Sequence, residues 1–315
     1  MSTRSRLPLR LAATVLAVGC AAGGVAGAGQ ARRPHPAALA AFARPAQAAR
    51  PTAGSAAGAA GSAHQARNFK KGVSAWAFPG VRSALAQSGV HWYYTWATGP
   101  GGISTPRGVS FVPMIWGPGS VTAAGLRQAR QAGHVLLTFN EPDMGSQSNM
   151  TVDQALRLWP QLMATGMRLS SPAVAYGGDT PGGWLDQFLR GAAARHYRVN
   201  FIALHWYGGD FTTRDAVSQL RSYLQAVWNR YHKAIWLTEF ALIRFGATTA
   251  FPSPQLQAAF VTAATAMLQR LPYVWRYAWF ALPSNSTDGS VGLFRAGAVP
   301  TIPGQAFKKV DAPPA

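Results

Sequence analysis

Eight short apolar runs alternate with helical patterns along the C-terminal four-fifths of this 315-residue chain. Runs of this length, rich in β-branched and aromatic residues, are typical of buried strands, and strands that alternate with helices form parallel sheets. The runs are Lys71–Trp76, His91–Trp96, Ser110–Trp116, His134–Asn140, Leu169–Tyr176, Phe201–Tyr207, Ala234–Glu239 and Tyr277–Leu282. Eight such repeats in about 250 residues predict an α/β fold, a single (β/α)8 TIM barrel.

Capping signals and apolar periodicity place the helices between these runs. The expected helices span 81–87, 122–132, 151–167, a segment that begins at Asp179 or Thr180, a segment from Thr212 or Thr213 to 228, 254–271 and a closing 303–310. The stretch 100–108 is expected to be a loop, and Pro283–Ser290 a polar loop at the carboxyl end of the barrel.

The first 66 residues have a composition that does not suit a packed core. Three arginines precede an apolar run at Leu11–Val18, and Ala/Gly-rich sequence follows, which predicts a secretory signal peptide over 1–31. Residues 32–66 are Ala, Pro, Arg, Gly and Ser without periodicity and are expected to be a disordered linker. The folded domain is then 67–315, and the protein is expected to be secreted, or associated with the cell envelope. An uncleaved anchor and lipid attachment at Cys20 are left open.

The charge and the cysteine count exclude several classes of function. Cys20 is the only cysteine, so the mature domain has no disulfide and no cysteine-ligated metal. The formal net charge is +19, and eight arginines with no acid lie before residue 68. The other arginines stand singly on predicted helices, which indicates a solvated face rather than a nucleic-acid site. They include Arg127, Arg130, Arg157, Arg168, Arg190, Arg195, Arg221 and Arg230. We expect no metal or cofactor, no nucleic-acid partner, no membrane contact beyond the signal sequence, and a monomer.

Glutamate is nearly absent from the chain. Glu141 and Glu239 are the only two among 315 residues, and each stands at or just past the end of an apolar strand. A single carboxylate in such a place is more often an ion-pair partner or a helix cap. Two in equivalent places are what hydrolysis of a glycosidic bond requires, because one carboxyl donates a proton and the other attacks the anomeric carbon.

Aromatic and polar side chains accompany the glutamates at the predicted strand ends. Flat rings stack on pyranose faces, and amide and imidazole groups bind sugar hydroxyls, so this set predicts a sugar-binding cleft. Its members are Trp76, Tyr94, Trp96, Trp116, Asn140, His205, Tyr207 and Trp279. Asn140 is expected to bind the sugar 2-hydroxyl. His205 and Tyr207 lie two residues apart on one strand and are expected to orient Glu239. Each tryptophan taken alone is equally consistent with core packing, as is His205.

Several segments taken in order resemble the Asl-type glycosyl hydrolases, glycoside hydrolase family 128. They include Trp92–Trp96, Phe111–Trp116, Phe139–Asp143, Ser171–Val174, His205–Gly208, Trp236–Phe240 and Tyr277–Phe280, and they span about Lys71 to Lys308. The resemblance implies a (β/α)8 retaining hydrolase active on β-1,3-glucan, with Glu141 as the acid/base and Glu239 as the nucleophile. The Gly-rich loop 99–108 departs from the family pattern, which leaves endo or exo action open.

Two other functions remain compatible with the sequence. One is a related barrel that cleaves another β-linked polymer, such as xylan or mannan. The other is a catalytically silent glucan-binding protein of the cell wall, although retention of both glutamates argues against it.

Overall fold

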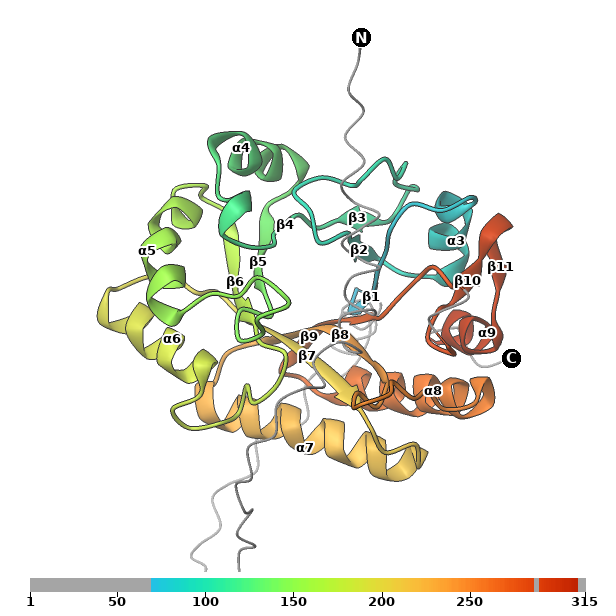
Figure 1. The fold of residues 1–315 in the computed structure, drawn as a ribbon. Coiled ribbons are helices and arrows are strands. Elements are labelled where there is room, and N and C mark those ends of the chain that lie inside the picture. Colours follow the sequence, from blue (N-terminus) through green and yellow to red (C-terminus); the bar gives the residue numbers. More distant parts are fainter. Residues whose placement is uncertain (1–68, 286–288, 311–315) are drawn as a thin grey trace, which may run out of the picture.

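The computed structural model describes residues 69–285 and 289–310, and the predicted signal peptide and linker lie outside them. Eight strand positions surround a central axis and helices form the outer ring, which confirms the predicted (β/α)8 barrel (Figure 1). All pairings within the barrel are parallel. The strands are β1 (Lys71–Ser74), β2 (Trp92–Tyr94), β3 (Ser110–Phe111), β4 (Met114–Ile115), β5 (Val135–Asn140), β6 (Arg168–Ala173), β7 (Ile202–Gly208), β8 (Ile235–Leu242) and β9 (Val274–Trp279).

The third strand position is interrupted, and the barrel closes through short bridges. Val112 and Pro113 separate β3, which pairs with β2, from β4, which pairs with β5. Proline cannot donate to a ladder, which explains the break in the predicted 110–116 strand. Single bridges from Ser170 to Phe201 and from Val174 to Leu204 join β6 to β7 and complete the circle.

The last strand begins earlier than the sequence pattern predicts. β9 covers Val274–Trp279 rather than 277–282, and β8 continues three residues beyond Glu239. Two short strands, β10 (Phe294–Arg295) and β11 (Val299–Pro300), form an antiparallel pair that was not predicted.

The predicted helices are present, with corrected ends. They are α3 (Val81–Ser88), α4 (Ala123–Ala132), α5 (Val152–Met163), α6 (Trp184–Ala194), α7 (Thr213–Tyr231), α8 (Pro254–Arg270) and α9 (Ile302–Lys309). The prediction that Asp179 or Thr180 caps α6 is wrong. Gly182 has a positive φ of 71°, which ends a turn there, and Gly183 is the N-cap. α5 ends at Met163 rather than Met167, and Arg168, predicted to be helical, is the first residue of β6.

The half of the barrel interior nearer the N-terminal ends of the strands is filled by aromatic side chains around one arginine. The Trp92 and Trp236 rings, from the non-adjacent strands β2 and β8, lie 5.3 Å apart, so they meet across the interior. Arg276 lies 4.3 Å from the centre of the Trp236 ring and 5.6 Å from that of Trp92. A Cβ at Gly72 would fall 2.2 Å from the Trp92 ring, so glycine is required there. We call Trp92, Phe201, Trp236 and Arg276 the basal plug.

None of the described helices is both long and apolar enough to cross a membrane.

Candidate active site

The two glutamates reach the same place from strands on different sides of the barrel. Glu141 directly follows β5 with φ 42°, a left-handed conformation that is rare outside glycine and asparagine and that clusters at functional sites. Its N–H donates to Ala173 O at 2.7 Å, which fixes the turn at the strand end. Glu239 lies where the register of β8 shifts against both β7 and β9. Such bulges re-aim side chains next to active sites.

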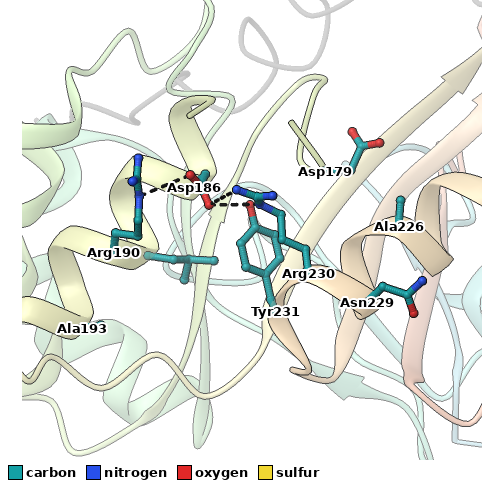
Figure 2. Close-up of a pocket in the computed structure, with 9 residues that line it drawn as sticks. Asp179, Asp186, Arg190, Ala193, Ala226, Asn229, Arg230 and Tyr231 are labelled. Carbon is teal, nitrogen blue, oxygen red and sulfur yellow. Dashed lines mark hydrogen bonds and ion pairs between the residues drawn. The ribbon is translucent and has the colours of Figure 1, made fainter. Parts of the chain in front are cut away.

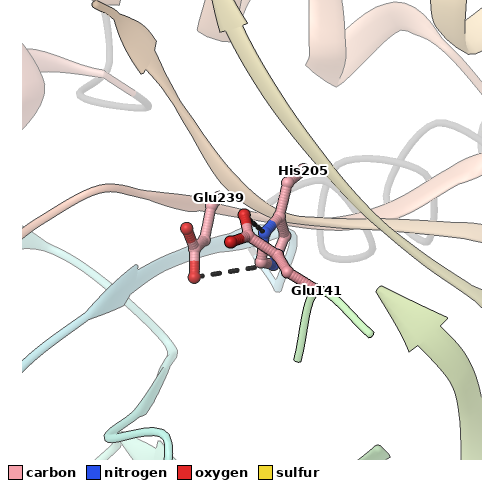
Figure 3. Close-up of side chains that lie close together, drawn as sticks. All are labelled: Glu141, His205 and Glu239. Atoms are coloured by element: carbon pink, nitrogen blue, oxygen red, sulfur yellow. Dashed lines mark hydrogen bonds and ion pairs between the residues drawn. The ribbon is translucent and has the colours of Figure 1, made fainter. Parts of the chain in front are cut away.

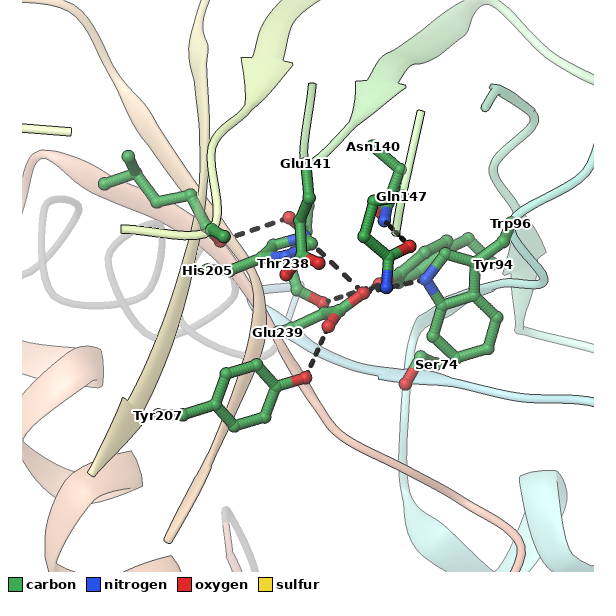
Figure 4. A network of polar contacts seen from close by, with 12 residues as sticks. Ser74, Tyr94, Trp96, Asn140, Glu141, Gln147, His205, Tyr207, Thr238 and Glu239 are labelled. Atoms are coloured by element: carbon green, nitrogen blue, oxygen red, sulfur yellow. Dashed lines mark hydrogen bonds and ion pairs between the residues drawn. The ribbon is translucent and has the colours of Figure 1, made fainter. Parts of the chain in front are cut away.

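Three hydrogen-bond donors converge on the Glu239 carboxylate (Figure 4). Its Oε1 accepts from Trp96 Nε1 at 2.7 Å and from Tyr94 Oη at 3.0 Å. Its Oε2 accepts from the Tyr207 hydroxyl. Trp96, like Glu141, has a left-handed backbone, with φ 54°. The carboxylate is 1% exposed, so these donors stand in for the water it has lost.

His205 lies between the two glutamates (Figure 3). Its Nδ1 is 2.8 Å from Glu141 Oε1, and its Nε2 is 3.5 Å from Glu239 Oε1. The sequence analysis assigned His205 and Tyr207 together to Glu239. Tyr207 does contact Glu239, whereas the short contact of His205 is with Glu141. One carboxylate oxygen of each glutamate and a ring nitrogen of His205 lie within 4.8 Å of one another.

Burial and neighbouring charges shift the pKa values of several groups around the two glutamates. Burial raises the pKa of Glu141 above its usual range, the His205 hydrogen bond and charge oppose that rise, and the negative charge of Glu239 adds to it. Burial acts to lower the pKa of His205, but the charges of Glu239 and Glu141 outweigh it and the pKa is raised. Burial, with the negative charge of Glu239, holds the pKa values of Tyr94 and Tyr207 well above 10, so both remain donors.

Several buried polar atoms beside the glutamates have no hydrogen-bond partner among the described residues. They include Asn140 Oδ1, Trp116 Nε1 and His205 Nε2, the last of which is 3.5 Å from Glu239 Oε1. Asn140 is 1% exposed, and its Nδ2 has one long contact, 3.4 Å to Gln147 Oε1. A buried polar group left unpaired costs about 1–3 kcal/mol, so these atoms mark a place where a polar ligand would restore hydrogen bonds.

The predicted aromatic residues divide into two groups. Trp76 is half-buried and its ring lies 6.3 Å from that of Trp96, which places it beside the carboxylates. The prediction that Trp279 contacts sugar is wrong. Its ring is fully buried against Phe240 and Phe260, and its Nε1 donates to Val291 O at 2.8 Å. It belongs to the layer between β9 and α8.

Strand parity identifies a residue that the sequence analysis missed. Successive strand residues point to opposite faces, so Phe280, adjacent to Trp279, points into the barrel. Its ring packs edge-on against Trp96 at 5.9 Å and against Tyr207 at 5.6 Å, two of the three residues that donate to Glu239. Phe280 shares its parity with Arg276, whose guanidinium also lies in the barrel interior.

Asp143 was also missed. Its Oδ1 accepts from Ala175 N at 3.0 Å and so ties the turn after β5 to the loop after β6. That loop presents Tyr176, which is 71% exposed. The Asn-Glu-Pro-Asp run was noted in the sequence, but no pattern assigned a role to its aspartate.

Glu141, His205 and Glu239 are close enough to share one metal ion. The donors around Glu239 argue against that use, because three positive N–H and O–H groups already point at its oxygens and would repel a cation. The arrangement fits a carboxylate held in place by hydrogen bonds rather than a metal ligand.

A second polar cavity, of about 680 Å³, lies between α6 and α7 (Figure 2). Its buried Asp186 is bound by Arg230 at 2.7 Å, by Arg190 at 3.3 Å and by the Gly182 N–H at 2.9 Å. The charge of Asp186 is fully compensated, so this cavity is an ion-pair junction between two helices.

A (β/α)8 barrel with two facing glutamates, an aromatic lining and a strand-end asparagine defines the class of glycoside hydrolases. The chain belongs to the family described as glycosyl hydrolase catalytic core, whose model matches residues 74–306.

Solved structures extend this assignment and confirm the resemblance to glycoside hydrolase family 128. One is the subgroup I endo-β-1,3-glucanase of Amycolatopsis mediterranei in complex with laminaritriose. It is 60% identical with a TM-score of 0.74, over 77% of this chain and 99% of that one. A subgroup II endo-β-1,3-glucanase from Sorangium cellulosum is 29% identical with a TM-score of 0.65, over 76% and 98% of the two chains. Alkali-sensitive linkage protein 1 of Schizosaccharomyces pombe is 30% identical, but the match covers 68% of this chain and only 38% of the yeast protein.

Proposed function

We propose that this protein is an endo-β-1,3-glucanase that retains anomeric configuration, with Glu239 as nucleophile and Glu141 as acid/base. One observation carries the mechanism: an oxygen of each glutamate lies within the same 4.8 Å cluster. Retaining glycosidases have carboxyl groups about 5–5.5 Å apart, whereas inverting enzymes need about 6.5–9.5 Å to admit a water. The substrate follows from the similar proteins, which are endo-β-1,3-glucanases, one of them bound to laminaritriose.

The first half of the reaction uses the two glutamates in opposite protonation states. The ionised Glu239 attacks the anomeric carbon and forms a glycosyl ester. Glu141 gives its proton to the glycosidic oxygen, so the bond breaks and the leaving sugar departs as an alcohol. The raised pKa of Glu141 keeps that proton available at a pH where an ordinary glutamate has lost it.

The second half reverses the role of Glu141. As a carboxylate it takes a proton from water, the water oxygen bonds to the anomeric carbon, and Glu239 leaves as a carboxylate. The donors Trp96, Tyr94 and Tyr207 stabilise the charge that returns to Glu239. Asn140, whose Oδ1 lacks a protein partner, is placed to bind the sugar 2-hydroxyl.

Secretion is part of the same proposal. The predicted signal peptide supports it, and a polymeric glucan that cannot enter a cell requires an extracellular enzyme. Association with the cell envelope and action as a monomer remain predictions.

The test is reducing-sugar release from a panel of laminarin, xylan and mannan, with anomeric configuration followed by proton NMR. We expect laminarin to be cleaved to oligosaccharides whose first-formed anomer is β. Glu141→Ala and Glu239→Ala should each reduce turnover by at least about 10²–10⁴-fold. Azide should restore turnover to the Glu239→Ala variant, with a glycosyl azide as product.

Three results would contradict the proposal. An α-anomer formed first would indicate inversion. Preferred cleavage of xylan or mannan would identify the related barrel considered above. Binding to insoluble glucan without release of reducing ends would identify a non-catalytic wall protein.

A further inference from the structure

Acidic residues occupy one end of the barrel. Glu141, Glu239 and Asp143 are in the active site, and Asp153, Asp186 and Asp215 are in the first turns of α5, α6 and α7. Asp179 and Asp210 lie in loops that follow β6 and β7. In this fold, the segments after strands and the first turns of helices belong to the catalytic end. All eight acids of the described residues are therefore at that end. Asp288 and Asp311 lie outside the described part of the chain.

The opposite end, built from the last helical turns and the starts of strands, carries basic side chains. We call it the basal face. Its exposed cations include Arg130 at the end of α4, Arg168 at the start of β6, Arg198 before β7, Arg270 at the end of α8 and Lys309 at the end of α9. Within 69–285 and 289–310, no acidic residue lies on this face.

Cations such as Arg82, Arg214 and Arg244 also lie at the catalytic end, so the two ends differ in that the described basal face has no acid. Helix dipoles explain only part of that difference. Basic residues in last turns complement the negative ends of α4, α8 and α9, and acids in first turns complement the positive ends. Arg198 donates to Met163 O at the end of α5, at 3.2 Å, and so also complements a helix end. Arg168 and Arg276, however, are strand residues, so no dipole accounts for them. Arg276 also lies close enough to Arg168 for the two charges to repel, which adds to the effect of burial in lowering the pKa of Arg276. Two neighbouring cations with no acid nearby disfavour each other unless an anion binds.

The basal face also has features that suit a sugar polymer with anionic groups. A cavity of about 260 Å³ is lined by Arg130, His134 and Thr165, and no acid lines it. Trp275 is 47% exposed, with the Arg168 guanidinium 5.5 Å from the centre of its ring. An indole face beside a guanidinium can stack on a sugar ring and pair with its phosphate or carboxylate.

The segment that precedes β1 in the sequence is also positively charged. Residues 32–67 contain five arginines and no acid, and they are covalently joined to β1, which begins on this face.

We propose that the basal face binds an anionic glycopolymer of the cell envelope, one with repeating phosphate groups, and leaves the catalytic cleft at the other end free. A membrane fits less well as the partner, because Phe69 and Trp275 are the only large apolar side chains exposed on the described part of this face. Phe69 packs beside His91, and Trp275 packs beside Arg168. Nucleic acid fits less well because the cations come from separate elements around the barrel and do not follow one groove.

The experiment compares two triple variants of the full chain with equal changes in charge. Arg130→Glu, Arg168→Glu and Arg270→Glu together remove basal cations. The matched control, Arg127→Glu, Arg157→Glu and Arg221→Glu, replaces exposed arginines at the middle of α4, α5 and α7. Binding to immobilised poly(ribitol phosphate) wall teichoic acid is measured from about 0.05 to 0.3 M salt, beside anionic phosphatidylglycerol vesicles and duplex DNA.

We expect the parent protein to bind the teichoic acid with an affinity that falls steeply with salt. The basal variant should lose at least about tenfold in affinity, and the control should lose less than about threefold. Both should hydrolyse laminarin at the parent rate, so the outcome is independent of the proposed catalytic function. Equal losses in the two variants would overturn the proposal, since net charge alone would then explain binding. Tighter binding to vesicles or DNA than to teichoic acid would also overturn it.

Discussion

The two ends of the barrel interior each bury a charged group among aromatic residues, and they do so in opposite ways. At the catalytic end, the Glu239 carboxylate receives N–H and O–H donors from the edges of Trp96, Tyr94 and Tyr207. In the basal plug, the Arg276 guanidinium lies over the faces of Trp236 and Trp92. Aromatic rings are positive at the edge and negative at the face, so aromatic residues can stabilise a buried anion with their edges and a buried cation with their faces.

The comparison also separates function from stability. The donors at Glu239 are directional and act on the group that we propose as the nucleophile. The faces at Arg276 are not directional, and burial lowers the pKa of that arginine to about 10, so its charge is disfavoured there. We therefore expect substitutions at the catalytic end to change turnover, and substitutions in the basal plug to change only stability.

The largest expected effect is at the donors to Glu239. Tyr94→Phe together with Tyr207→Phe should reduce kcat on laminarin by about 10²–10³-fold, because each loses a hydroxyl that stabilises the carboxylate as it leaves. Steady-state kinetics measure this, and thermal unfolding of the variant serves as the control for folding. A loss of less than tenfold would show that Trp96 alone sustains the site.

The next largest effect is a loss of folding stability when the Arg276 side chain of the basal plug is truncated. Arg276→Ala should lower the free energy of unfolding by about 2–4 kcal/mol, since it leaves a cavity between two indole rings. Chemical denaturation gives the change, and kcat of the folded variant should equal that of the parent. A comparable loss in kcat would show that the two ends are coupled.

A smaller effect is expected at His205. Activity requires protonated Glu141, so kcat/KM should fall as pH rises through the raised pKa of that group, above the usual value of about 4.3. His205→Gln removes a neighbour that lowers the pKa of Glu141. The alkaline limb of the profile should therefore move to higher pH. A shift to lower pH would mean that His205 acts on the site in another way.

The smallest effect tests the charge of the basal plug. Arg276→Met retains much of the side-chain volume and removes a cation that the folded state disfavours, so stability should change by less than about 1 kcal/mol or rise. Because the pKa of Arg276 is lower in the folded state, unfolding binds a proton above about pH 10, and the parent should gain stability as pH rises there. The Met variant should lack that gain.

The barrel and the meeting of its two glutamates could be predicted from sequence because both rest on local signals. Alternating apolar runs fix the fold, and the chain's two glutamates stand beside two of those runs. Residues such as Phe280 and Trp279 could not be assigned, because large apolar side chains occupy both faces of this strand and the sequence pattern does not show which face turns inward. The pairing of His205 with Glu141 was also beyond reach, since it depends on the left-handed turn at Glu141 and on a register shift opposite His205.

That register shift allows both Trp236 and Glu239 of β8 to point into the barrel interior. In an unbroken strand, residues three apart point to opposite sides. Trp236 and Glu239 are three apart, yet the first lies in the basal plug and the second reaches Tyr94 across the barrel. The unpaired Thr238 makes this possible, since His205 pairs with Glu239 where Leu204 pairs with Leu237. A regular pairing of β8 that took Thr238 into the register would turn the carboxylate outward toward the helices without any change in the sequence.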